Sequence, residues 1–219
     1  MWNGNRAAVY FMPLFVLIVL AATACSRGEG APSTAKSTAP ATAELGEFPP
    51  ESLQASGGSK VALPAERGRV ATVIVCMSVE CPISNEFLPA IQDLAESYRP
   101  KGVSFVGINP NGGESLEVMA AYAKQHELVF PFLKDDGGKI SRRLLFNVTP
   151  EARVFDAAGE IVYRGRIDDR YRPGSGEPGA TIKRDLADAL DEVLAGKPVS
   201  QARTRTVGCP IQPAAPAAK

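Results

Sequence analysis

The chain has 219 residues, of which 45% are hydrophobic, so it is large enough for one folded domain with additional terminal segments. Its 24 basic and 24 acidic residues balance each other, and no dense basic stripe runs through the sequence. These features argue against proteins that bind nucleic acid through a strongly basic surface, so we expect no nucleic-acid partner.

The first 24 residues have the pattern of an export signal. Arg6 supplies a positive flank, residues 7–20 are apolar, and small residues at 21–24 lead directly to Cys25. We therefore predict a signal peptide over residues 1–24. Small residues followed at once by cysteine resemble the lipobox of bacterial lipoproteins, which implies that Cys25 carries a lipid and anchors the exported protein at a membrane in the cell envelope or periplasm.

Two other interpretations of this segment stay open. The signal could be cleaved with Cys25 present by chance, or the segment could stay as an anchor helix, because its apolar run approaches the roughly 20 residues that span a bilayer.

The predicted domain lies between two segments of biased composition. Residues 25–58 are rich in Ala, Pro, Ser, Thr and Gly, which predicts a flexible linker because such a stretch buries little apolar surface. We expect the folded domain at 59–197 and a C-terminal tail at 198–219 that contains Cys209.

The first half of the domain alternates between strand and helix patterns. Residues 69–77 are a nearly continuous β-branched run, which is typical of a central strand that is buried on both faces. A helix begins at Cys81 and Pro82, since apolar residues then recur at helical spacing up to Tyr98 and proline is tolerated in a first turn. A second strand at 103–108 and a second helix around 116–123 follow.

The second half predicts a short helix at 140–146, a strand hairpin at 152–156 and 161–166, and a last helix at 182–194. The order places parallel strands first and a hairpin last. This predicts an α/β fold of three layers, in which a mixed central β-sheet is covered by helices on both faces.

The arrangement of motifs resembles the thioredoxin fold over residues 45–197. A strand leads into Cys81-Pro82-Ile83-Ser84 at the start of a helix, and Thr149-Pro150 precede a hairpin and a closing helix. Residues 130–136, 147–150 and 163–169 resemble the redoxin domains of the group named for alkyl hydroperoxide reductase and thiol-specific antioxidant. This resemblance implies a thiol–disulfide oxidoreductase.

The resemblance makes Cys81 the candidate nucleophile. A cysteine reacts as its thiolate, and a helix N-terminus favours that form through its unpaired N–H groups and dipole. Ser84 replaces the second cysteine of a Cys-x-x-Cys pair, so it could donate a hydrogen bond to the thiolate but could not resolve a mixed disulfide. The family also implies that Pro150, after Thr149, forms a cis peptide bond beside the cysteine and leaves a backbone edge open to a substrate strand.

Two further cysteines bear on how Cys81 is resolved. Cys76 lies among Val and Ile in the central strand, so we interpret it as a small buried hydrophobic residue. Cys209 lies between Gly and Pro on the predicted tail, so we hypothesise that this mobile segment brings it to Cys81 in an oxidising compartment.

Two alternatives to disulfide exchange remain open. A peroxiredoxin-like thiol peroxidase is suggested by Ser78, which keeps the hydroxyl residue of the peroxiredoxin motif, although Ile74 stands where that motif has proline. Peroxiredoxins also have an arginine beside the reactive cysteine, but here Pro150 stands at that position and Arg153 lies three residues later. Without that cation, disulfide exchange is favoured over peroxide reduction. The second alternative is a non-catalytic binding module.

The expected partners are a protein or small-molecule disulfide or a peroxide, together with the membrane that holds Cys25. We expect no cofactor and no metal, because the single histidine, His126, falls near a helix end where a surface or capping role is usual.

Overall fold

The structure is a computed structural model that describes residues 47–171 and 183–213. The strands are β1 (Ser52–Ala55), β2 (Lys60–Ala62), β3 (Ala71–Cys76), β4 (Val103–Asn109), β5 (Phe132–Lys134), β6 (Val148–Thr149), β7 (Glu151–Asp156), β8 (Ile161–Gly165) and β9 (Cys209–Pro210). The helices are α1 (Pro82–Tyr98), α2 (Leu116–Gln125), α3 (Lys139–Arg143) and α4 (Asp185–Leu194), with 3-10 turns η1 (Leu63–Glu66), η2 (Arg99–Lys101) and η3 (Asp136–Gly138).

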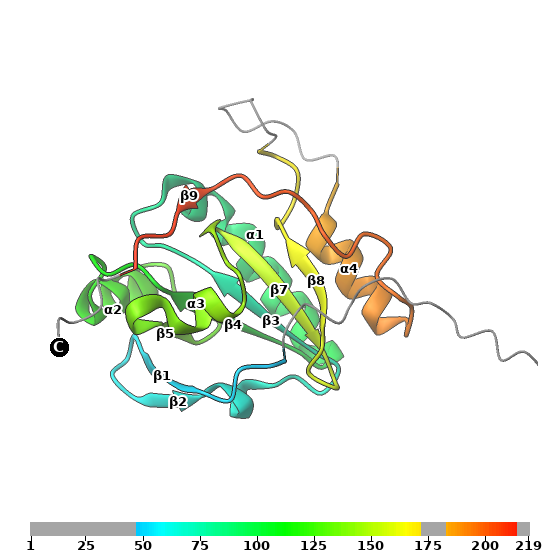
Figure 1. Cartoon of the computed structure of the whole chain (residues 1–219), viewed down its shortest axis with the longest axis horizontal. Coiled ribbons are helices and arrows are strands. Elements are labelled where there is room, and N and C mark those ends of the chain that lie inside the picture. Colours follow the sequence, from blue (N-terminus) through cyan, green and yellow to red (C-terminus); the bar gives the residue numbers. More distant parts are fainter. Residues whose placement is uncertain (1–46, 172–182, 214–219) are drawn as a thin grey trace, which may run out of the picture. The chain divides into compact units, whose positions relative to one another are not determined.

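Seven strands form one mixed sheet in the order β2-β1-β5-β4-β3-β7-β8 (Figure 1). β3, β4 and β5 are parallel neighbours, whereas the pairs at both sides of them are antiparallel. β6 and β9 form a separate antiparallel pair. The predicted α/β class and the β7–β8 hairpin are therefore confirmed.

β3 is the centre of this sheet, and all six of its residues are buried. Because successive strand side chains point to opposite faces, Val73 and Val75 pack into a core with α1, α2 and α4, whereas Ile74 and Cys76 pack into a second core with α3. Helices cover both faces, as predicted. The continuous β-branched run at 69–77 therefore predicts correctly that this strand is buried on both faces.

Helix α1 begins where the sequence predicts. Cys81 is its N-cap and Pro82 its first residue, where a missing N–H costs no intrahelical bond. The helix buries a stripe that includes Phe87, Ile91 and Tyr98, and each large apolar side chain removed from water contributes about 1.5–3 kcal/mol. This packing fixes the position of Cys81 at the end of the connection from β3.

The predicted linker at 25–58 is wrong for its last part. Residues 52–55 form β1, which pairs with β5 and β2, and Glu47 bridges to Glu160. The domain thus includes residues before 59. The sequence pattern missed β1, β2 and β5 because strands of three or four residues show no clear alternation, and the sheet supplies the backbone hydrogen bonds that hold them.

The tail predicted at 198–219 is also corrected, because its described part packs on the domain. Thr204 donates from its N–H to the carbonyl oxygen of Arg164 in β8, whose own N–H donates to Ala202. The hydroxyl of Thr204 lies 2.8 Å from that of Tyr163. A side chain at Gly165 would collide with Thr204, so glycine permits this close passage. The segment continues to β9, and Cys209 belongs to a paired strand (Figure 1).

The predicted signal peptide at 1–24, Cys25 and the linker up to residue 46 lie outside the described residues. Within 47–171 and 183–213, no helix combines the length and apolar character that a membrane span requires.

Candidate functional site

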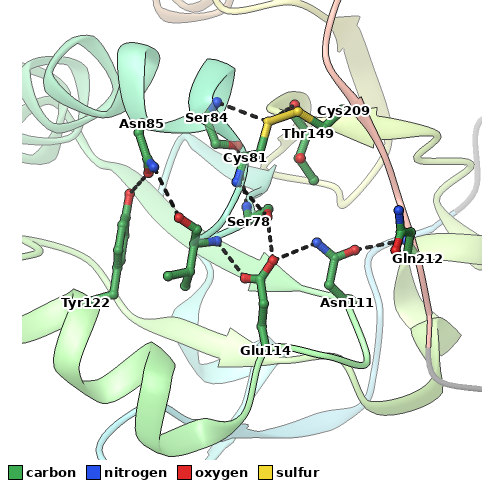
Figure 2. The surroundings of a disulfide bond; sticks show 11 residues. Ser78, Cys81, Ser84, Asn85, Asn111, Glu114, Tyr122, Thr149, Cys209 and Gln212 are labelled. Carbon is green, nitrogen blue, oxygen red and sulfur yellow. Dashed lines mark hydrogen bonds between the residues drawn. A yellow bond between two sulfur atoms is a disulfide. The ribbon is translucent and has the colours of Figure 1, made fainter.

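Three separate parts of the chain meet at Cys81. Cys81 caps α1 and forms a disulfide with Cys209 of β9, with 6.0 Å between their Cα atoms (Figure 2). Its sulfur lies 3.2 Å from the carbonyl oxygen of Thr149. The Thr149–Pro150 peptide bond is cis, which confirms the expectation for Pro150.

The start of α1 presents a backbone donor to the sulfur. The amide N–H of Ser84 points at Cys81 Sγ, with 3.4 Å between nitrogen and sulfur. Cys81 is only 3% exposed, whereas Cys209 is partly exposed. The donor and the positive end of the helix therefore act on a sulfur that is largely shielded from water.

The expected hydrogen bond from the Ser84 hydroxyl to Cys81 is absent. That hydroxyl oxygen instead accepts from the N–H of Ser78 at 3.4 Å, and Ser84 is fully buried. The reason lies in helix geometry, because the N–H of the third helical residue is the group directed at the N-cap side chain. Ser84 contacts the sulfur through its backbone.

Ser78 connects the cysteine to a buried carboxylate. Its hydroxyl oxygen accepts from the N–H of Cys81 at 3.1 Å and donates to Glu114 at 2.5 Å. Glu114 also accepts from the N–H of Val79 and from the side-chain amide of Asn111 (Figure 2). The side-chain amide of Asn109 is a further donor to Glu114. Burial raises the pKa of Glu114, but these hydrogen bonds outweigh it and hold the pKa below its ordinary value.

Glu114 was missed in the sequence analysis. A signal was present, because residues 109–114 follow directly after the second predicted strand. The carboxyl ends of parallel neighbours lie at the same edge of a sheet, so the loops after β3 and β4 meet there. A polar residue in the second loop could have been predicted to approach Cys81.

A second brace holds the loop before α1 from the other side. Asn85 donates from its side-chain amide to the carbonyl oxygen of Val79 at 3.1 Å, and its oxygen accepts from the Tyr122 hydroxyl at 2.8 Å (Figure 2). The loop that carries Cys81 is thus tied to both Glu114 and α2.

The Cys209 segment is bound at both its sides. β9 pairs with β6 through Thr149 opposite Cys209, and Ile211 donates from its N–H to Asn147. On the other side, Gly112 donates to the carbonyl oxygen of Gln212 at 2.8 Å, and the N–H of Gln212 donates to Asn111 Oδ1 at 2.9 Å. Asn111 therefore joins the Glu114 cluster to the Cys209 segment.

A cavity of about 210 Å³ opens beside the disulfide. Its lining residues are Ser78, Glu80, Cys81, Asn111, Gly113, Glu114, Cys209, Pro210 and Gln212. Two of these are acidic and none is basic. The cavity thus offers no cationic side chain to a thiolate at Cys81.

The comparison with family models agrees with this geometry. The model of the AhpC/TSA family matches residues 46–164, which is more than half of the 219 residues. The chain belongs to the AhpC/TSA family.

Relatives of this AhpC/TSA chain include a chloroplastic peroxiredoxin Q of Sedum lineare, which is 30% identical over 128 residues, 54% of this chain and 67% of the relative. An uncharacterised conserved protein of Geobacillus kaustophilus has a similar structure, with a TM-score of 0.71, 34% identity, and coverage of 79% of this chain and 93% of the other. A secreted disulfide oxidoreductase of Mycobacterium tuberculosis shares the fold, with a TM-score of 0.50, 20% identity, and coverage of 67% and 96%.

Arg153 is not a cation of the Cys81 site. It lies opposite Ile74 in the sheet and is 1% exposed. Its guanidinium donates to the carbonyl oxygens of Leu144 and Leu145 and pairs with Glu151 at 3.0 Å. Arg153 therefore braces the segment before the cis bond, and its donors are already used in this structural role.

Cys76 and His126 lie where the sequence predicts. Cys76 is fully buried, as predicted, and burial raises the pKa of its thiol well above the usual value, with smaller contributions from Glu151 and Asp135. His126 is the C-cap of α2, in agreement with the expected capping role. Among the described residues, no group of three or more metal-ligating side chains lies together.

Proposed function

We propose that this AhpC/TSA chain is a thiol–disulfide oxidoreductase in which Cys81 is the nucleophile and Cys209 is the resolving cysteine. The observation that carries the proposal is the disulfide between Cys81, at the N-terminus of α1, and Cys209, on a segment that a separate part of the chain supplies. Cys209 thus takes the role of the second cysteine of a Cys-x-x-Cys motif, which is replaced by Ser84 in this chain.

In the first step, the Cys81 thiolate attacks one sulfur of a substrate disulfide. A bond forms between Cys81 Sγ and that sulfur, the substrate S–S bond breaks, and the other substrate sulfur leaves as a thiolate that takes a proton from water. The N–H of Ser84 and the positive end of α1 favour the reactive thiolate, while Ser78 holds the N–H of Cys81 and so positions the residue.

In the second step, the Cys209 thiolate attacks Cys81 Sγ. The Cys81–Cys209 disulfide forms and the remaining substrate sulfur leaves as a thiol after protonation. The net change oxidises two protein thiols and reduces one substrate disulfide to two thiols. A dithiol reductant then returns the protein to its starting state by the same exchange.

The surroundings of Cys81 favour disulfides over peroxides as substrates. Reduction of a peroxide requires donors to the departing oxygen and a cation beside the thiolate. The cavity at Cys81 is lined by Glu80 and Glu114 and by no basic residue, and Arg153 is used elsewhere. The similarity to peroxiredoxin Q keeps peroxide reduction as the second candidate function.

Mass spectrometry of the reduced protein after addition of glutathione disulfide tests the proposal. The wild-type chain should lose two hydrogens and end with Cys81 joined to Cys209. The Cys209→Ser variant should stop with glutathione on Cys81, and Cys81→Ser should carry none at that position. Turnover that survives Cys81→Ser would overturn the proposal, and rapid peroxide consumption with slow disulfide exchange would assign the protein to the peroxidases.

The location of the protein is part of the proposal. A signal peptide over residues 1–24 and lipid on Cys25 would place the domain in the cell envelope, attached to a membrane. An oxidising compartment of that kind is where protein disulfides persist. Mass measurement of the N-terminal peptide from cells would reveal cleavage before Cys25 and the added lipid.

A further inference from the structure

The disulfide between Cys81 and Cys209 is chemically equivalent to a mixed disulfide between Cys81 and a bound polypeptide. In both cases an extended strand places a cysteine sulfur on Cys81 Sγ. Here the strand is β9, which pairs with β6 so that Cys209 lies opposite Thr149 and Pro210 opposite Val148. Segment 208–212 thus shows how a polypeptide fits beside the nucleophile; this inference rests on the proposed disulfide exchange.

The groove that holds segment 208–212 contacts it mainly through backbone atoms. One wall is the backbone of Asn147 and Thr149, and the other is formed by Asn111 and Gly112. Backbone pairing of this kind supplies affinity for a bound polypeptide with little dependence on most of its side chains. Selectivity for the polypeptide sequence must therefore come from positions where the groove has no space for a side chain.

Gly208, directly before the cysteine, is such a place. A Cβ at this position would lie 2.5 Å from the carbonyl oxygen of Thr149, 2.9 Å from its carbonyl carbon and 3.1 Å from Cβ of Val148. Gly208 is not among the glycines with a positive φ, so the restriction comes from space and not from backbone conformation. The two closest atoms are backbone atoms of Thr149 in β6 and cannot rotate away as a side chain can.

We propose that the groove between Thr149 and Asn111 selects extended polypeptides in which glycine directly precedes the disulfide-bonded cysteine. In the oxidised protein the chain's own Gly208-Cys209 occupies this groove. The groove holds one strand, so a substrate polypeptide enters when reduction of the Cys81–Cys209 bond frees the C-terminal segment. Cys209 returns to the groove as the reduced substrate leaves.

Synthetic peptides test this selection without altering the groove. The reduced full chain with Cys25→Ser and Cys209→Ser is mixed with Thr-Val-Gly-Cys-Pro-Ile whose cysteine carries a coloured aromatic thiol as a disulfide. Attack by Cys81 forms the Cys81–peptide disulfide and releases the coloured thiol, so the rate is read from absorbance. The compared peptide has alanine for glycine.

The alanine peptide should react about tenfold more slowly, because the added methyl group must displace backbone atoms. A matched control peptide with alanine in place of the proline should react like the glycine peptide, since Pro210 is exposed. Dithiothreitol should release the thiol from all three peptides at equal rates.

Equal rates for the glycine and alanine peptides at Cys81 would overturn the selection. The proposed disulfide exchange would survive that result, since it requires only that Cys81 reacts with glutathione disulfide. If Cys81 reacts with neither, the proposed function itself fails.

The full chain offers a second measurement. Gly208→Ala should shift the Cys81–Cys209 pair toward the dithiol in a glutathione redox buffer. Gly57→Ala is the matched control, since a Cβ there meets nothing within 4 Å, and it should leave the equilibrium unchanged. An unchanged equilibrium in Gly208→Ala would contradict the steric restriction.

Discussion

Reduction of the Cys81–Cys209 disulfide should cost the folded protein a large part of its stability. The bond connects residues that are 128 positions apart, so it closes a loop that contains most of the folded domain. The chain-entropy relation gives about 5 kcal/mol for a loop of this length, and native disulfides usually contribute about 2–5 kcal/mol when they are removed. We expect reduction to lower the free energy of unfolding by an amount in this range.

Urea unfolding followed by circular dichroism measures the effect. With an m-value of about 1–3 kcal/mol/M, a loss of about 2–5 kcal/mol lowers the unfolding midpoint by about 0.7–5 M when dithiothreitol is added to the full chain. The chain should carry Cys25→Ser in this experiment, so that Cys25 takes no part in exchange. Cys76→Ala should be included as well, because Cys76 is buried in the folded protein but its thiol becomes available for exchange on unfolding.

The matched control is Cys209→Ser in the same background. This variant lacks the bond, so its free energy of unfolding should equal that of the reduced parent within a few tenths of a kcal/mol, and its midpoint should not respond to dithiothreitol. A parent midpoint that is insensitive to reductant would refute the reasoning. So would a variant that loses as much stability on reduction as the parent does.

Two further predictions concern buried charged groups near the site. Burial by itself raises the pKa of Glu114, but the hydrogen bonds to its carboxylate outweigh burial and hold the pKa below 4.5. The carboxylate therefore stabilises the fold above pH 4.5, and this stabilisation is lost as the pH falls through the folded-state pKa. The stability gap between wild type and Glu114→Gln should thus be larger at about pH 7 than at about pH 3.5 in urea unfolding, and a constant gap would contradict this. Arg153→Lys should lower the free energy of unfolding by about 2–4 kcal/mol, since lysine lacks the planar group that donates to the carbonyl oxygens of both Leu144 and Leu145. The folded variant should react with glutathione disulfide at Cys81 as fast as the wild type does, and a slower reaction would contradict the structural role of Arg153.

Local patterns predicted the elements around Cys81 because those elements are long and their burial is regular. The β-branched run of β3 and the helical spacing of Phe87, Ile91 and Tyr98 in α1 each report one strong physical preference. Since Cys81 stands between them, its place at the N-terminus of α1 followed from the same patterns. The cis bond at Pro150 was inferred from the family resemblance and is present.

The short elements could not be predicted in this way. β1, β6 and β9 have two to four residues each. β6 and β9 find their backbone partners in each other, far apart in the chain, and β1 needs distant β5 in addition to neighbouring β2. Gly208 looked like part of a mobile tail because a lone glycine lowers local order. Its actual role is to let β9 approach Thr149 closely, and no local pattern contains that contact.

The sequence by itself determined the α/β class, the central strand and the position of a cysteine at the start of a helix, because each of these depends on residues that are neighbours in the chain. The sequence suggested Cys209 as a partner of Cys81, but only the tertiary structure decided that pairing and showed that Glu114 anchors the loop before α1. The physical reason is distance along the chain. These contacts join segments that are brought together only when the sheet has formed.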